Sequence, residues 1–151
     1  MPYFIMSFLS RKSDLTPEQF KSYYIGSHMP LVRQLVGSHF PVRCIQRYIQ
    51  RGEGTDEGDN TERNSWTPAT VLHGDQSDFD FDVVVTMEFK DAAAFRAHRD
   101  FVNQGDVLTK LIEDEKRFID RDETRTVVLG DIIETTAQST RTIPDSIFLD
   151  C

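Results

Sequence analysis

A proline inside a strongly predicted helix constrains the fold of this chain more than any other feature. The segment LTPEQFKSYYIGSHMPLVRQLVGSHF, residues 15–40, opens with an N-cap, a proline suited to the first helical position and a capping box, which are formed by Thr16, Pro17 and Gln19. The pattern predicts a helix that runs from Pro17 to about Val36. Pro30 lacks a backbone donor, and its ring crowds the preceding turn. We therefore expect the helix to kink or break near residues 27–29 and to resume at Pro30.

The same helix carries an aromatic stripe that includes a histidine. Phe20, Tyr24 and His28 recur at four-residue steps, so they point to one side of the helix. His28 therefore faces the way the core-facing aromatic residues face, at the expected junction. Two interpretations are open: a core histidine that donates to a backbone carbonyl, or an imidazole that takes part in chemistry.

The order of predicted elements indicates the fold class. Strands are predicted at residues 3–9, 42–51, 82–89 and 124–129, and helices at residues 17–36, 92–102 and 106–119. The order strand, helix, strand, strand, helix, strand is that of an α+β, ferredoxin-like antiparallel sheet with helices on one face. The first and third strands are apolar on both faces, so the face without helices needs a cover. A second copy of the chain is the simplest one, and we expect a homodimer.

Two segments lie outside this plan. Residues 52–79 form the least regular stretch, whose glycine-rich, acidic first part is expected to be a solvated loop. The second part holds the only tryptophan together with His73 and Phe79, and we expect it to cover a pocket. We assign residues 1–131 to one domain and residues 132–151 to a tail that packs on the domain or on a neighbouring copy.

Composition excludes several classes of function. The net charge of −8 argues against a nucleic-acid partner. No apolar run reaches the roughly 20 residues that a membrane-spanning helix needs, and the first residues do not read as a signal peptide. The two cysteines do not form a disulfide framework, which favours a reducing, cytoplasmic location. No metal-ligand spacing, phosphate loop or nucleophile elbow is present, so we expect neither a metal nor a cofactor.

The motifs resemble those of a known family. A turn followed by Leu-(Ser/Thr)-Pro-Glu-x-Phe and then His-x-Pro-Leu is the mark of the EthD-domain proteins of the dimeric α/β-barrel superfamily, and this chain reads LTPEQF and HMPL at those places. The later pieces SHFPVRCIQRYIQR, SDFDFDVVVTMEFKDAAAF, EDEKRFIDR and VVLGD resemble one branch, fungal proteins of aromatic polyketide pathways. The resemblance covers about residues 1–131.

The resemblance implies a function in secondary metabolism. Members of the branch are understood to include cofactor-free decarboxylases, which are lyases that act on anthrone-type or atrochrysone-type carboxylic acids. The expected partner is therefore a small aromatic polyketide substrate. Two alternatives stay open: a cyclase or dehydratase that acts on a poly-keto chain, and a non-catalytic polyketide-binding partner.

The chemistry of decarboxylation selects candidate residues. The developing oxyanion needs a donor, and the carbon that loses carbon dioxide needs a proton source with a pKa near neutrality, for which histidine is suited. We assign these catalytic roles to His28 and His39, and interpret His98 as core packing. The candidate substrate-binding residues, which would orient phenolic oxygens or form flat apolar walls, are Tyr24, Tyr48, Phe8, Trp66, Met87 and His73.

Overall fold

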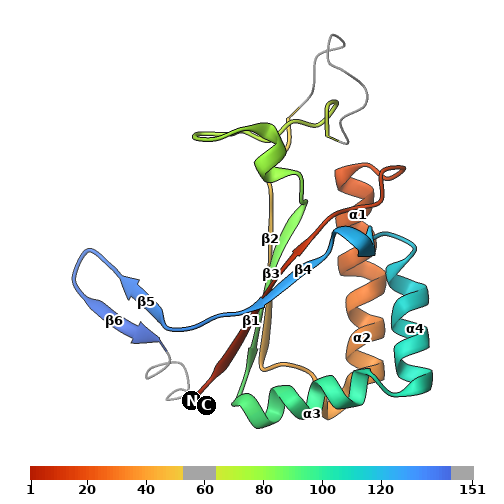
Figure 1. Cartoon of the computed structure of the whole chain (residues 1–151), viewed down its shortest axis with the longest axis vertical. Helices are drawn as coiled ribbons and strands as arrows, with labels where there is room; N and C mark the ends of the chain where they lie inside the picture. Colours follow the sequence, from red (N-terminus) through yellow and green to blue (C-terminus); the bar gives the residue numbers. More distant parts are fainter. Residues whose placement is uncertain (53–63, 144–151) are drawn as a thin grey trace.

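The computed structural model describes residues 1–52 and 64–143, and it contains a four-stranded antiparallel sheet with all long helices on one face (Figure 1). The strand order is β2-β3-β1-β4. The strands are β1 (Tyr3–Leu9), β2 (Arg43–Tyr48), β3 (Val83–Phe89) and β4 (Arg125–Val128). The predicted acidic loop, residues 53–63, and the end of the tail, residues 144–151, lie outside the described residues.

Within the described residues, four longer helical segments and three short ones join these strands, in addition to the π-helical turn of the first helix. The longer segments are α1 (Pro17–Tyr23), α2 (Met29–Val36), α3 (Ala92–Val102) and α4 (Gly105–Glu115). The short ones are η2 (Gly37–His39), η3 (Gln76–Phe79) and η4 (Arg121–Glu123). The predicted α+β class and antiparallel sheet are therefore confirmed. In the described ranges no helix combines the length and apolar character needed to cross a membrane.

The first helix begins as predicted but accommodates its proline differently. The Thr16 hydroxyl accepts from the Gln19 N–H at 3.1 Å, and the Gln19 side chain accepts from the Thr16 N–H at 2.9 Å, which confirms the capping box. Instead of a break, a π-helical turn, η1 (Tyr24–His28), joins α1 to α2. The Met29 N–H reaches back five residues to the Tyr24 carbonyl. This wider turn directly precedes Pro30, which cannot continue the α-helical hydrogen-bond ladder itself.

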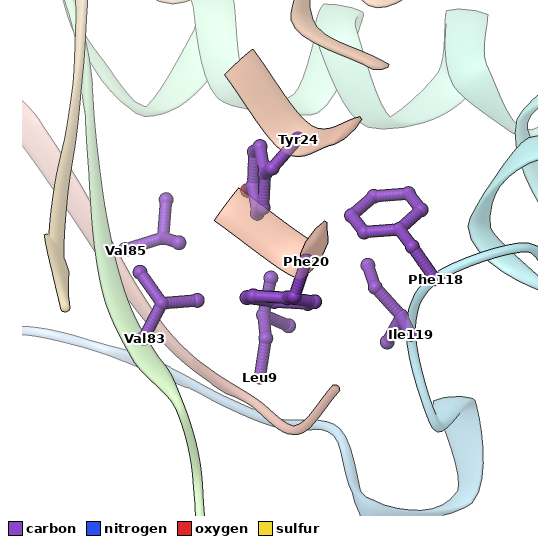
Figure 2. Packing of buried hydrophobic residues seen from close by; sticks show 7 residues of the cluster. All are labelled: Leu9, Phe20, Tyr24, Val83, Val85, Phe118 and Ile119. Carbon is purple, nitrogen blue, oxygen red and sulfur yellow. The ribbon is translucent and has the colours of Figure 1, made fainter. Parts of the chain in front are cut away.

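The core lies between the first helix and the sheet. Alternate residues of β1 and β3 face the helices, and Phe20 and Phe118 pack against them with no solvent exposure. Figure 2 shows how the side chains of this cluster converge: Leu9, Phe20, Tyr24, Val83, Val85, Phe118 and Ile119. Burial of this aromatic cluster fixes the first helix against the strands.

A buried charge network anchors the described part of the loop between β2 and β3. The Arg11 guanidinium contacts the Asp82 carboxylate at 2.9 Å, and both residues are almost fully buried. Arg11 also donates to the Asn64 side chain, and Arg51 donates to the Phe81 carbonyl at 2.7 Å. These bonds hold residues 64–81 at the end of the sheet near the start of α1 (Figure 1).

The tail contains regular structure that the sequence did not indicate. Strands β5 (Ile132–Thr135) and β6 (Thr140–Ile143) form a separate two-stranded antiparallel hairpin. The hairpin projects from the side of the sheet opposite the helices (Figure 1). Ile133 within it is 56% exposed in the single chain.

Candidate functional site

A cavity of about 270 Å³ lies between the first helix and the sheet. The sheet forms one wall, the first helix faces it, and α3 and α4 close the remaining sides. Its lining is mainly apolar, and comprises Ser7, Leu9, Tyr24, His28, Met29, Val32, Phe40, Pro41, Cys44, Val85, Met87, His98, Val102, Leu111, Glu115, Ile119, Thr124 and Thr126. A mainly apolar pocket with a few polar groups is the usual form of a small-molecule site.

His28 is the most specifically held of the polar groups. Its Nδ1 lies 2.7 Å from Oδ2 of Asp114, and both residues are buried, with 7% of each surface exposed. The Tyr23 hydroxyl donates to the other carboxylate oxygen, Oδ1, at 2.6 Å. Because the carboxylate accepts at Nδ1, that nitrogen carries a hydrogen. Nε2, the second ring nitrogen, makes no hydrogen bond with any described residue.

The π-helical turn explains why Tyr23 and His28 reach the same carboxylate. Successive residues of an α-helix are rotated by about 100°, so residues five apart would point about 140° from each other. Five residues make up the π-helical turn that ends at His28, and this wider turn brings residues five apart closer to one face. The proline-driven irregularity therefore creates the paired contacts to Asp114.

A second imidazole, that of His98, lines the cavity from α3. Its Nδ1 lies 2.8 Å from the backbone carbonyl of His39. Burial is the main cause that lowers the pKa of His98 below its ordinary value. The ring also packs against Phe89, with 5.0 Å between the ring centroids.

The other polar groups of the cavity are mostly hydroxyls. Ser7 and Thr126 share a hydrogen bond of 2.9 Å on the sheet wall. Glu115 is bound by the Arg121 guanidinium at 2.8 Å. Among the described residues, no lysine or arginine lines the cavity. An anionic group that enters would thus meet hydroxyls and imidazoles instead of a fixed cation.

Three of the residues predicted from the sequence line this cavity: His28, Tyr24 and Met87. Tyr24 is 5% exposed, and burial strongly raises the pKa of its hydroxyl. The Tyr24 ring meets the His28 ring edge-on, with 5.5 Å between their centroids. The structure therefore brings together the helix residues of the predicted site and one residue of β3.

The other predicted residues lie elsewhere. The His39 ring stacks on Phe101, with 4.7 Å between the ring centroids, and only its backbone carbonyl reaches His98. Tyr48 packs beside Phe20 and donates to the Gln46 side chain, and burial raises its pKa to about 12.

The remaining three are Phe8, Trp66 and His73. Phe8 contacts Phe81 edge-on at 5.0 Å between ring centroids, while Trp66 is 48% exposed and His73 is exposed. None of them, nor any other residue from 64 to 79, lines the cavity. The described part of the loop is therefore not its cover.

The sequence reasoning missed Asp114 and interpreted His98 as packing. Asp114 follows Leu111 by three residues on α4, so it falls on the apolar stripe of that helix. A carboxylate on an inward-facing stripe was the available signal, because such a group is rarely buried without a partner. No cluster of three or more metal-ligating side chains occurs in the part of the chain that the structure describes.

Comparison with known proteins assigns the chain to a family. A search of curated proteins found no match. Among solved structures, an ethyl tert-butyl ether d (EthD) family protein from Bacillus halodurans shares 14% identity, with 87% of this chain and 100% of that chain covered and a TM-score of 0.49. An EthD-like protein from Ralstonia eutropha also shares 14% identity, with 85% and 87% covered and a TM-score of 0.45. The family model of the EthD domain matches residues 12–122, which is most of the sequence, and the chain therefore belongs to the EthD domain family.

Proposed function

We propose that this protein is a cofactor-free decarboxylase of an aromatic polyketide carboxylic acid of the anthrone or atrochrysone type. One observation carries the proposal: a buried imidazole, held by a carboxylate, borders a mainly apolar cavity that no described lysine or arginine lines. An apolar site disfavours a localised carboxylate charge relative to the delocalised charge of the transition state. It therefore favours the step in which that charge spreads into a ring system.

His28 supplies the proton in this proposal. In the β-keto form of the acid the bond between the carboxyl carbon and the ring carbon breaks, carbon dioxide leaves, and the electron pair remains on the substrate as an enolate. The ring carbon then takes a proton from Nε2 of the His28 imidazolium, which regains one from water. Asp114 holds Nδ1–H and stabilises the positive ring through the 2.7 Å contact.

The cavity walls account for binding in the same proposal. Tyr24 and Met87 present an aromatic and a thioether surface that suit a flat ring system. The hydrogen-bonded hydroxyls of Ser7 and Thr126 have two hydrogens between them and use only one in their mutual bond. The remaining hydroxyl hydrogen is available to a carbonyl or carboxylate oxygen of the substrate.

We also propose that two copies pair through the sheet face that bears no helices. Alternation of the strands and the pairing register place apolar side chains on that face: Met6, Phe8, Ile45, Val84 and Val127. Val127 is 51% exposed in the single chain. Light scattering on the purified protein should give a dimer mass, and Val127→Glu should give a folded monomer. A wild-type protein that is monomeric at all concentrations would contradict the pairing.

Incubation of the purified protein with an anthrone-type carboxylic acid, without added metal or flavin, tests the proposed reaction. We expect stoichiometric carbon dioxide and the decarboxylated anthrone, and loss of turnover in His28→Ala with unchanged circular dichroism. Lys110→Ala is the matched control, because Lys110 is an exposed residue one turn before Asp114 on α4. A product that keeps its carboxylate but has closed a ring or lost water would contradict decarboxylation and would support a cyclase or dehydratase instead.

A further inference from the structure

His98 is the cavity imidazole that the proposed reaction does not use. Its Nδ1 lies 2.8 Å from the His39 carbonyl oxygen, which can only accept a hydrogen bond. Nδ1 must therefore carry the hydrogen. In the neutral ring, Nε2 then holds a lone pair and can only accept.

The surroundings of His98 keep the ring neutral. The partner on Nδ1 is an uncharged carbonyl, and the His98 ring is packed against Phe89. Burial, the largest cause, lowers the pKa of His98, so the ring is uncharged near neutral pH. Its Nε2 makes no hydrogen bond with a described residue.

The two imidazoles of the cavity thus have different hydrogen-bond partners at Nδ1. His28 is backed by a carboxylate at Nδ1, and in the proposed reaction its Nε2 gives a proton to the ligand. His98 is backed by a carbonyl and presents an acceptor. The acidic residue of the lining, Glu115, is already engaged by Arg121 at 2.8 Å. A ligand that fills the cavity therefore needs a hydrogen-bond donor for His98, in addition to the proton that it receives from His28.

We propose that Nε2 of His98 accepts a hydrogen bond from a hydroxyl group of the bound aromatic acid, so that the site selects hydroxyaryl acids over their O-methyl ethers. This inference rests on the proposed function, because it takes the ligand of the cavity to be an aromatic acid. A methyl ether cannot donate, and it leaves the Nε2 acceptor, which the bound ligand covers, without a partner. Leaving such a group unpaired weakens binding by roughly tenfold or more.

Calorimetric titration with 6-hydroxy-2-naphthoic acid and with 6-methoxy-2-naphthoic acid, in which the substituent lies too far from the carboxylate for an internal hydrogen bond, tests this selection. We expect wild-type protein to bind the hydroxy acid about tenfold or more tighter than the ether. His98→Phe keeps an aromatic ring of similar shape and should bind the two probes equally. Arg96→Ala is the control, because Arg96 is exposed on the same helix, two residues from His98, and should keep the full preference.

Nitrogen-15 NMR of the imidazoles is measured on the wild-type protein, so its result does not depend on whether a variant folds correctly. In the free wild-type protein near neutral pH, we expect His98 to carry its hydrogen on Nδ1 and a bare Nε2. Addition of 6-hydroxy-2-naphthoic acid should shift the Nε2 resonance in the direction of a hydrogen-bonded acceptor. The methoxy probe should leave that resonance unchanged.

The outcomes separate this inference from the proposed reaction. Equal affinity of wild type for the two probes, a preference retained in His98→Phe, no binding of either probe, or a hydrogen on Nε2 of the free protein would each overturn the role of His98. Carbon dioxide release without the preference would overturn this inference alone. The preference without carbon dioxide release from an anthrone-type acid would overturn the proposed reaction alone.

Discussion

Replacing Asp114 by asparagine keeps the shape of the side chain but removes the charge that holds His28. In the structure the carboxylate accepts from Tyr23 at 2.6 Å and contacts Nδ1 of His28 at 2.7 Å. A hydrogen bond to a charged group contributes about 1.5–3 kcal/mol, and a neutral one about 0.5–1.5 kcal/mol. The asparagine oxygen can accept from Nδ1–H, and its NH₂ group can donate to the Tyr23 oxygen, so both contacts survive in weaker form. We therefore expect Asp114→Asn to lower the free energy of unfolding by about 2 kcal/mol, about 1 kcal/mol for each contact.

Urea unfolding followed by circular dichroism measures this loss, and a thermal scan should show a melting temperature lower by roughly 4–8 °C. Tyr23→Phe removes one of the two charged bonds outright and should cost about 2 kcal/mol. In the Tyr23→Phe background, Asp114→Asn should then cost only about 1 kcal/mol, because one charged contact remains to be lost. An Asp114→Asn protein within about 0.5 kcal/mol of wild type would refute the claim that the carboxylate holds both groups as a charged acceptor.

Four further predictions concern single side chains. His39→Ala removes the ring but keeps the backbone carbonyl that binds His98, so turnover of an anthrone-type acid should persist. A loss of turnover as large as that of His28→Ala would show that the His39 ring takes part in catalysis. Burial raises the pKa of Cys44, so in a Cys151→Ser background Cys44 should react with iodoacetamide more slowly than free cysteine does. A ligand in the cavity should slow this alkylation further, as measured by mass spectrometry. An alkylation rate that the ligand does not change would show that the ligand binds elsewhere. Trp66 lies outside the cavity, so its fluorescence should be quenched by acrylamide equally with and without ligand, and protection by ligand would place the loop over the site. The pKa of His98 is lower in the folded state, so below about pH 6.5 the unfolded chain binds more protons than the folded protein. The contribution of His98 to stability is therefore full above that pH and is lost as the pH falls through the folded-state pKa. Urea unfolding at a series of pH values should show a smaller fall in stability for His98→Phe than for wild type.

Local signals in the sequence were enough for most of the fold. The capping residues placed the start of the first helix at Pro17, and the apolar runs placed strands at residues 3–9 and 82–89, where the structure has β1 and β3. Pro30 predicted an irregularity but not its form. The choice between a kink and a wider turn depends on contacts across the chain, such as those of Tyr23 and His28 with a carboxylate on α4.

The site was less accessible to sequence reasoning for a physical reason. A helical stripe shows which side chains point inward, but it does not show whether they meet packed atoms or an open space. His98 and Phe101 are three residues apart on α3 and so lie on one side of it, yet His98 borders the cavity and Phe101 packs on the His39 ring. The hairpin β5–β6 escaped prediction because its two four-residue strands, IIET and TRTI, do not alternate between apolar and polar residues.

The π-helical turn divides the first helix into two parts with different tasks. Before it, Phe20 belongs to the aromatic core; after it, Met29 and Val32 form the wall of the cavity. The additional residue in the turn changes the rotational phase of the second part without moving the first. A substitution at Val32, which lines the cavity and is not part of the core cluster, can therefore reshape the chamber while that cluster keeps its packing, which gives this fold a way to change ligands at little cost in stability.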